Sequence, residues 1–390
     1  MRPNHYTLTP RNVTRLTVQI LFDTLAWSSP RVEAQLLVEL LVHAAAQTRS
    51  LAAVVAATLG IPSLETIRQT LYGLLPADPV DFLATTTRML HQRRPHTLTQ
   101  KPQVLAVDLH LRPYYGQKTT RGTYRGQKKD GTRTFFAYAT LIVLRRGRAV
   151  TVGLTPVVKG LEQTVLLDRL LTQARNAGIA VKYLLLDRGF YAAATLHWLQ
   201  QQSIAFVLPM IRRGRRARRK ADCTGTERFF VTGRRGWDTY TWKAKRSRDG
   251  NPPVSVTIDV CMASVDSRTK KKRKRLLVYA CHGIRKPSAQ IVALYKRRFG
   301  IETSYRQLGQ GLAMTCSKNP TYRLLLVAIA LVLRNVWVWL HWRVLSQRSA
   351  VVGEPRHLCL WRLRLRTLLA WIVRALDDRL RSRAKVTSVE

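Results

Sequence analysis

Two strongly apolar runs of this chain carry an aspartate, and this feature constrains the fold more than any other. The run VLAVDLHL contains Asp108, and the run YLLLDRGF contains Asp187. Runs of this kind are typical of strands buried on both faces of a sheet, where a carboxylate is costly unless a cation meets it. An aspartate at the end of a strand can also cap the next helix, and for either residue alone this is an equally good interpretation. The occurrence of both favours a site for divalent metal ions.

The charge of the chain predicts its partner. The sequence has 66 Lys and Arg residues against 22 Asp and Glu residues, which gives a formal net charge of +44 at pH 7. An isolated monomer with this charge repels itself, whereas a polyanion turns the charge into affinity. The partner should therefore be nucleic acid. With 390 residues, 46% of them hydrophobic, the chain can bury a large core, which excludes a disordered basic tail or a small architectural peptide.

Cysteine usage and hydropathy favour a protein of a reducing cytoplasm without a membrane span. No two cysteines form a C-x2-C pair, so neither a disulfide framework nor a zinc site is indicated; they are Cys223, Cys261, Cys281, Cys316 and Cys359. Residues 1–17 lack an apolar signal core. The best membrane candidate, residues 324–340, is interrupted by Arg334 and Asn335. A buried helix is therefore predicted there.

The first 98 residues are predicted to form a helical DNA-binding domain. Apolar patterns indicate helices at residues 32–46, 51–59 and 63–75, with a break at residues 60–62. Ser63 is a good N-cap, so residues 51–75 have the pattern of a helix-turn-helix that presents Arg68 and Gln69 to DNA. Ordinary packing of two helices explains the same pattern equally well.

Residues 99–211 change to a strand pattern. Strands are expected at residues 104–109, 134–144, 149–158, 181–186 and 204–209, with a helix at residues 161–176. This order predicts an α+β or α/β fold of the ribonuclease-H-like type, a mixed sheet that begins with three meandering strands. The first and fourth strands are neighbours in that sheet, which brings Asp108 and Asp187 side by side.

Residues 212–275 are dense in Arg and Lys and are predicted to form an inserted basic β subdomain that contacts DNA. Its β-like pieces are residues 229–232, 238–243 and 254–260, and the run 270–275 is interpreted as a solvated, phosphate-contacting loop. The core then resumes over residues 276–320, with a strand at residues 276–281 and a helix that carries Glu302. Residues 321–390 form a helical C-terminal region.

The helix around Glu302 supplies the third acidic candidate. Tyr295, Arg298 and Glu302 follow one another at i, i+3 and i+7, so they share one helix face, and Arg306 lies one turn further. Ion pairing on a surface helix explains the spacing, but it does not explain why Glu302 is the single acid between Asp266 and Glu354. A phosphate-gripping Arg beside a metal-binding Glu is therefore favoured.

Asp108 in VDLH, Asp187 in LDRGF and the Y-x2-R-x3-E spacing resemble the DDE transposases of prokaryotic insertion sequences, in the group with a Tyr-Arg-Glu-Lys signature. The resemblance extends over about residues 104–318 and implies a ribonuclease-H-like core interrupted by a β-strand insertion. The signature places a Lys seven residues after the Glu, where this chain has Gly309. Arg306 or Lys318 is a candidate for the missing cation.

This resemblance implies an activity and its site residues. Asp108, Asp187 and Glu302 would bind two Mg²⁺ ions, with Mn²⁺ as a substitute, while Arg298 contacts phosphate and Tyr295 supports it. The reaction would release a 3′ hydroxyl at the element end and join it to target DNA. The partners would be the terminal inverted repeats and the target duplex, bound by a homodimer in a synaptic complex associated with the nucleoid.

Further residues are candidates for contact with DNA. Arg188 follows Asp187 directly, and Tyr114 and Tyr115 lead into a basic flap, residues 117–129, that ends on Lys128 and Lys129. In some relatives an insertion-domain aromatic stacks on a flipped base, and by location alone Trp237 and Trp242 are candidates for this role, although packing within the insertion is the favoured interpretation. His110 shares a strand face with Asp108 and is expected to be a structural donor, because magnesium prefers oxygen ligands.

Two other functions fit the same residues. A ribonuclease-H-like nuclease would use the same carboxylates without strand transfer, although the insertion and the additional helical regions favour a transposase. A non-enzymatic nucleoid protein would be held to DNA by charge alone, but it leaves the two strand aspartates without a partner. A membrane-surface protein is the weakest alternative, because the basic charge is spread along the whole chain.

Overall fold

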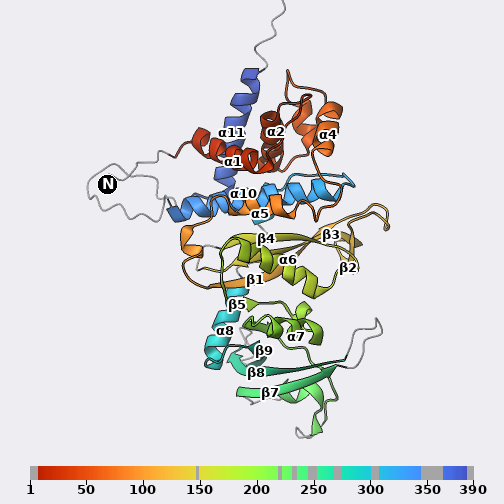
Figure 1. Ribbon diagram of the computed structural model, residues 1–390, viewed down its shortest axis with the longest axis vertical. Helices are drawn as coiled ribbons and strands as arrows, with labels where there is room; N and C mark the ends of the chain where they lie inside the picture. The colour runs from red at the N-terminus through yellow and green to blue at the C-terminus, as the bar shows by residue number, and fades with distance from the viewer. Residues whose placement is uncertain are drawn as a thin grey trace, which may run out of the picture.

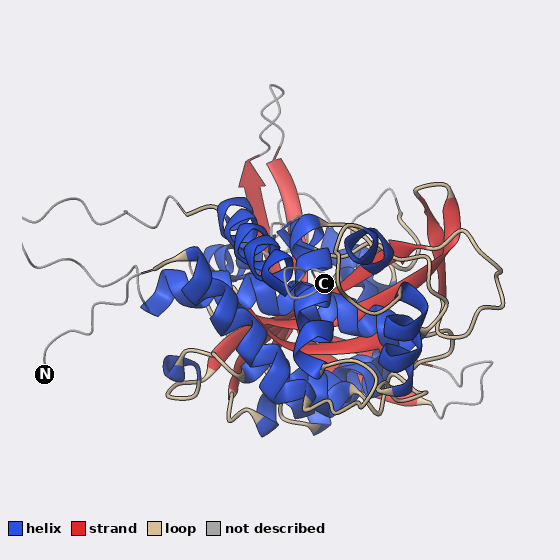
Figure 2. Ribbon diagram, turned by 90° about the horizontal axis from the view of Figure 1, so that it is seen from above, coloured by secondary structure: helices blue, strands red, loops and turns tan. Residues whose placement is uncertain are grey.

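The computed structural model describes residues 8–145, 149–217, 222–230, 235–244, 253–266, 274–299, 307–343 and 363–383. Within these ranges nine strands form one mixed sheet. The sheet extends along the long axis of the molecule, from the helices at one end to its last strand, β7, at the other (Figure 1). Helices α1, α2, α4 and α11 occupy the first end, with α10 and α5 between them and the sheet. Viewed from above, these helices overlie the strands (Figure 2).

The sheet has the order β2-β3-β1-β5-β6-β9-β8-β7, and β4 also pairs with β3. β1 is antiparallel to β3 but parallel to β5, and β5 is parallel to β6, whereas the other pairs are antiparallel. The strands are β1 Gln103–Pro113, β2 Tyr124–Lys129, β3 Thr132–Val143, β4 Val150–Val157, β5 Val181–Leu185, β6 Phe206–Pro209, β7 Gly236–Ala244, β8 Val254–Asp266 and β9 Lys274–His282. The mixed sheet with helices agrees with the fold class predicted from the sequence.

Helices account for most of the remaining described chain. The α-helices are α1 Pro10–Leu25, α2 Ala34–Gln47, α3 Leu51–Ala56, α4 Leu64–Gly73, α5 Leu83–His91, α6 Gln163–Asn176, α7 Ala193–Gln201, α8 Ser288–Lys296, α10 Pro320–Arg343 and α11 Leu365–Arg383. Short 3₁₀ turns are η1 His96–Leu98, η2 Arg188–Phe190, η4 Gly225–Phe230, η5 Arg297–Phe299 and η6 Gly309–Gly311. The sequence interpretation did not include α1 and α5. In α1 a Thr- and Val-rich sequence becomes helical because the Thr9 side chain caps it, Pro10 starts it, and one face packs in the helical core.

The basic region 212–275 differs from the separate β subdomain that the sequence predicted. Its strands β7 and β8 continue the main sheet, because β8 pairs along its length with β9, which in turn pairs with β6. Val256, Ile258 and Val260 are buried in the same core as α7. The strand expected at residues 229–232 is also wrong where the structure describes it, since Phe229 and Phe230 belong to η4.

Helix α10 contains the stretch 324–340 in which the sequence predicted a buried helix. It is long and apolar enough to cross a membrane by length and composition, which is weak evidence, and 78% of the relevant window is buried inside the protein. Its apolar side chains join those of α1, α2 and α11 in one core. The two polar residues that interrupt the stretch are partnered: Arg334 Nε donates to Gln307 Oε1 at 3.1 Å, and Asn335 bonds to a strand.

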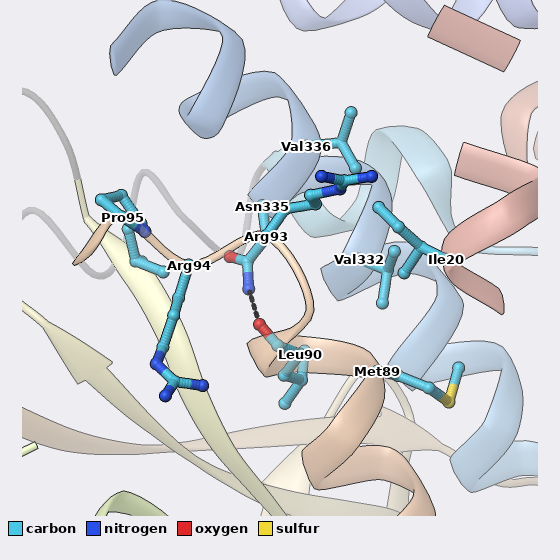
Figure 3. Close-up of a pocket in the computed structure, with 10 residues that line it drawn as sticks. Ile20, Met89, Leu90, Arg93, Arg94, Pro95, Val332, Asn335 and Val336 are labelled. Carbon is cyan, nitrogen blue, oxygen red and sulfur yellow. Dashed lines mark hydrogen bonds between the residues drawn. The ribbon is translucent and has the colours of Figure 1, made fainter. Parts of the chain in front are cut away.

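Three side chains close the outer edge of β4. The Asn335 amide accepts from the Thr151 N–H at 3.1 Å and donates to the Thr151 carbonyl at 2.8 Å, and it also reaches the Leu90 carbonyl of α5 at 3.5 Å (Figure 3). Gln173 of α6 pairs in the same two-way manner with Leu154, at 2.9 and 3.0 Å. His91 contacts the Val152 carbonyl at 2.6 Å. An exposed strand edge invites pairing with other chains, so these contacts both protect β4 and anchor the helical layers on the sheet.

Candidate active site

Asp108 and Asp187 meet at the centre of the sheet. In the parallel pairing of β1 with β5, Ala106 lies opposite Leu185. Asp108 and Asp187 each follow two residues after this aligned pair, so they lie side by side. Asp108 was expected near the end of its strand, but β1 continues to Pro113 because β3 pairs with it up to Phe135. β5 stops at Leu185, and Asp108 therefore lies where β1 runs past the end of its parallel neighbour.

The two carboxylates have different surroundings. The Asp108 side chain is 19% exposed, and its Oδ1 accepts from the Leu109 N–H at 3.0 Å. Asp187 is 52% exposed and caps η2, with its Oδ1 accepting from the Arg188 N–H at 2.7 Å. The capping interpretation considered for Asp187 is therefore correct locally, and the second oxygen, Oδ2, faces the space between the strands.

Arg298 bridges the two aspartates. Its Nη2 lies 3.1 Å from Asp108 Oδ1 and 3.6 Å from Asp187 Oδ2, and its side chain is only 10% exposed. The residue belongs to η5, which follows α8, so Tyr295 lies on an α-helix and Arg298 on the 3₁₀ turn after it. The sequence assigned Arg298 to phosphate, whereas in this structure its guanidinium neutralises charge between the carboxylates.

Tyr295 stabilises the backbone directly before Asp187. Its hydroxyl donates to the Leu186 carbonyl at 3.2 Å, one residue before Asp187, and its ring packs on Tyr279. Burial raises the pKa of Tyr295 to about 12, with Asp187 adding to the rise and Arg298 opposing it. The phenol therefore remains a hydrogen-bond donor at neutral pH, and it holds the backbone that places Asp187.

The donor set fits a divalent metal ion in chemistry. Asp108 and Asp187 offer hard carboxylate oxygens, which Mg²⁺ favours over nitrogen or sulfur ligands, and both contact one cation, Arg298. Among the described residues no group of three or more His, Cys, Asp or Glu side chains could hold a metal. Glu302, the third expected ligand, and Arg306 lie outside the described residues.

His110 lies on the same strand face as Asp108, as expected. It is opposite Tyr138 in the β1–β3 register. The pKa of His110 is lowered to about 4, mainly by burial, with Arg112 and Lys129 contributing. The imidazole is therefore neutral at physiological pH and adds no positive charge beside Asp108.

The other expected DNA contacts have varied surroundings. Lys128 and Lys129 are exposed on β2, which occupies part of the flap predicted as a loop, and Arg188 and Lys318 are exposed as well. Arg68 of α4 is exposed, but its Nη2 pairs with Glu65 Oε2 at 2.7 Å. Their contact with DNA stays a prediction.

Both insertion tryptophans pack against the protein. The Trp237 Nε1–H donates to the Lys286 carbonyl at 3.0 Å. Trp242 stacks on Tyr191 with ring centroids 5.1 Å apart, and the Arg213 guanidinium lies 4.6 Å from its ring. These contacts match the packing interpretation that the sequence favoured over base stacking.

Arg297 is a structural residue of the site that the sequence interpretation missed. It donates to the Leu144 carbonyl at the end of β3 at 2.5 Å, and so attaches η5 to the sheet. The adjacent pair in YKRRFG was the available signal, since two consecutive arginines at a helix end cannot point the same way.

A mixed sheet in which two aspartates meet across a parallel strand pair defines a fold of the ribonuclease-H-like type. A family model described as "Transposase DDE domain" matches residues 99–334, more than half of the chain. The chain therefore belongs to the DDE transposase family, which confirms the resemblance seen in its sequence motifs.

A solved structure supports the same fold. The chain is similar to the piggyBac transposase in a cryo-EM structure of its synaptic complex with hairpin DNA, with a TM-score of 0.56 and 10% sequence identity. The similarity covers 100% of this chain and 84% of that chain. No curated protein sequence matches the chain.

Proposed function

We propose that this protein binds the ends of an insertion element, cleaves a DNA phosphodiester bond there and joins the freed 3′ hydroxyl to target DNA. One observation carries the proposal: Asp108 and Asp187 meet across β1 and β5, inside the segment that matches the transposase family. The similar solved structure is a transposase in a synaptic complex with hairpin DNA, which supports DNA as the partner. In this proposal the partner is double-stranded DNA and the active assembly is a homodimer.

Asp108 and Asp187, with Glu302, are the residues that would hold the metal ions. When bound, two Mg²⁺ ions, or Mn²⁺ in their place, supply activation of the attacking oxygen and stabilisation of the leaving oxygen. Asp108 is the more buried ligand and is fixed in the middle of a strand, so it sets the position of the site. Asp187 is held by its bond from the Arg188 N–H and by Tyr295 below the preceding carbonyl.

Arg298 has a charge role in this proposal. Its guanidinium contacts one oxygen of each carboxylate, so a metal ion held by those oxygens would compete with these contacts. A guanidinium released at this point is next to the scissile phosphate, where its fixed fork can bind phosphate oxygens. The phosphate contact expected from the sequence and the carboxylate contact in the structure are then two states of one side chain.

The remaining parts of the proposal concern DNA binding and place of action. Residues 1–98 would bind the element end, and residues 212–275 would add basic contacts along the DNA. Residues 99–211 and 276–320 form the catalytic core, and residues 321–390 join it to the N-terminal helices. The individual DNA-contact candidates are Arg68, Lys128, Lys129, Arg188, Trp237, Trp242, Arg306 and Lys318. The reaction would take place in the prokaryotic cytoplasm, on nucleoid DNA.

The test is a cleavage map. The protein is incubated with Mg²⁺ or Mn²⁺ and a plasmid that carries its gene with the native flanking DNA, and every strand break and joint is sequenced. Breaks at paired inverted repeats and new joints to target DNA are expected. They should vanish in Asp187→Ala but persist in Asp168→Ala, a surface acid whose nearest cation, Arg175, is 3.9 Å away.

Two other outcomes would reject this proposal. Metal-dependent breaks without joining would assign the chain to the nuclease alternative. Cleavage that persists in Asp187→Ala would remove the paired aspartates from the mechanism.

A further inference from the structure

The hairpin of β2 and β3 is a basic ribbon with little acidic charge. Asp130 at its turn is the single acid between Asp108 and Glu162 in the sequence. The exposed cations on the ribbon and on the loop that leads into it are Lys118, Arg121, Arg125, Lys128, Lys129 and Arg133. A polyanion is therefore the partner that this surface fits by charge.

The tip of the hairpin is held in one shape. Asp130 and Gly131 both have positive φ angles, 50° and 81°, as in the tight two-residue turns that follow strand twist. The Tyr115 hydroxyl donates to the Asp130 carbonyl at 2.8 Å, while the side of the ring stays open and the residue is 73% exposed. An exposed aromatic with a fixed orientation binds a sugar or base at low cost in conformational entropy.

The register places two of these cations on the face of the sheet that carries Asp108. Asp108 is opposite Thr140 of β3, and Thr134 and Thr132 lie on the same face because they are six and eight residues away on one strand. Their partners on β2 are Arg125 and Lys129. One face of β3 therefore carries both the residue opposite the candidate metal ligand and the residues opposite the two hairpin cations, and the side chains between them, Tyr138 and Phe136, are buried against the helical core.

The distance along β3 between the position opposite Asp108 and the position opposite Lys129 can be compared with a length of DNA. Eight residues of strand from Thr140 to Thr132 span about 26 Å at about 3.3 Å per residue. Successive phosphates of one DNA strand are about 3.4 Å apart along the helix axis, so the same distance covers about eight nucleotides.

The base of the hairpin is joined to the helical layer. Arg121 lies 3.6 Å from Asp78, in the loop that follows α4, and a Cβ on Gly122 would be 2.8 Å from Pro320 at the start of α10. Figure 1 shows the β2 and β3 labels on the same side of the molecule as α4. A duplex held by α4 would therefore continue past the hairpin on its way to the aspartates.

We propose that the β2–β3 hairpin binds the backbone of the element-end duplex about eight nucleotides from the cleaved phosphate, with Arg125 and Lys129 on phosphates and the Tyr115 ring against a sugar. This inference rests on the proposed function, since that function defines the cleaved phosphate. It adds a second, fixed contact that measures the distance between the end-binding helices and the active site.

The experiment compares two triple variants of the full-length protein. Arg125, Lys128 and Lys129 are changed to Gln in one, and Arg366, Arg374 and Arg381 of α11, which are also exposed, are changed to Gln in the other. Both lose the same charge. Their Kd for a duplex that carries a native element end is measured by fluorescence anisotropy in EDTA from 50 to 200 mM salt. Hydroxyl-radical footprints are recorded on the same duplex, and cleavage is mapped in Mg²⁺.

The hairpin triple variant should bind with a flatter salt dependence. Two phosphate contacts, from Arg125 and Lys129, each worth about 0.9 in the slope of log K against log salt, predict that it loses about 12-fold less affinity than wild type over this fourfold range. It should also lose protection about eight nucleotides from the cleaved phosphate. The α11 variant should keep that protection, and Tyr115→Ala should lose protection at the same place over one or two nucleotides.

The outcomes separate this inference from the proposed function. A footprint that the hairpin triple variant leaves intact, with end cleavage by wild type observed, overturns the hairpin inference alone. Equal loss of protection in the α11 variant also overturns it, because the effect would then come from net charge. Absence of end cleavage by wild type overturns the proposed function and the inference together.

Discussion

Replacement of Arg298 tests whether its guanidinium occupies the place of a metal cation. In Arg298→Gln the positive charge between Asp108 and Asp187 is lost, and two carboxylates face each other without it. Removing one partner of a fully buried ion pair costs about 3–5 kcal/mol, and an exposed pair contributes about 0–1 kcal/mol. Arg298 and Asp108 are largely buried while Asp187 is half exposed, so a destabilisation of about 2 kcal/mol is expected without metal.

The same reasoning predicts a larger response to Mg²⁺ in the variant. In wild type a cation bound by these carboxylates would compete with the guanidinium contacts, whereas in Arg298→Gln it would relieve carboxylate repulsion. A ligand that binds only the folded state stabilises it by RT ln(1 + [L]/Kd). A lower Kd of the variant for Mg²⁺ therefore gives a larger rise in its Tm at the same Mg²⁺ concentration. In EDTA the Tm of the variant should be lower by about 2 °C, and Mg²⁺ should narrow this gap.

The assay is thermal unfolding in EDTA and over a Mg²⁺ titration, with Arg297→Gln as the matched control. Arg297 is the neighbouring arginine, and its side chain bonds to the Leu144 carbonyl. Its replacement should lower Tm without changing the Mg²⁺ response. Equal Mg²⁺ shifts in wild type and Arg298→Gln would refute the idea that the guanidinium and the metal compete.

Three further predictions follow from single contacts. Tyr295→Phe removes the bond to the Leu186 carbonyl, and cleavage in Mg²⁺ should fall about tenfold while the Kd for DNA stays within twofold. Burial raises the pKa of Tyr295 to about 12, whereas the unfolded phenol titrates near 10. Urea unfolding should therefore show that wild type loses stability more steeply than this variant between pH 10 and pH 12. Gly309→Lys, at an exposed position where an added Cβ meets nothing within 4 Å, should fold normally and lower the Kd for element-end DNA several-fold. Burial lowers the pKa of His91 to about 4 from 6.5, so the folded state resists protonation, and about 2 kcal/mol of stability should be lost between pH 7 and pH 5 in wild type but not in His91→Asn.

Each of these has a control and a contrary result. For Tyr295 the control is Tyr279→Phe, and equal losses of cleavage and binding would show a general structural effect. For Gly309 the control is Gly309→Gln, and a Kd that falls equally in both variants would exclude a charge contact. For His91, identical pH slopes of wild type and variant in urea unfolding would mean that other groups titrate there.

The sequence by itself determined the class of fold and predicted two residues of the candidate site. Short apolar runs bounded by turn residues are typical of strands buried on both faces of a sheet, and a carboxylate there is costly unless a cation meets it, so VLAVDLHL and YLLLDRGF together predicted both strands and a role for their carboxylates. The alternation of strands with the helix at residues 161–176 then predicted that Asp108 and Asp187 are neighbours. These inferences needed only local periodicity and the rules of sheet topology.

Helix boundaries and membership of the sheet depended on packing that the sequence does not display. The α1 sequence is poor in strong helix formers, and it is helical because its Thr9 cap and its buried face outweigh propensity. The strands of the basic region were predicted to form their own subdomain, because a local sequence pattern indicates that one face of a strand is buried but not which strand it pairs with. Pairing of β8 with β9 is a long-range contact, and it made them an extension of the main sheet.

The direction of the charged side chains was decided by tertiary structure alone. The Y-x2-R-x3-E spacing placed Arg298 on a functional face, but the choice between phosphate and carboxylate depends on which opposite charge is nearest once the strands are assembled. Tertiary structure also decided the place of Asp108 in its strand. The apolar pattern predicted that Asp108 lies near a strand end, but pairing with β3 extends β1 to Pro113, so Asp108 lies within the strand. Periodicity acts over a few residues, whereas an ion pair between residues 190 positions apart exists only after the chain has folded.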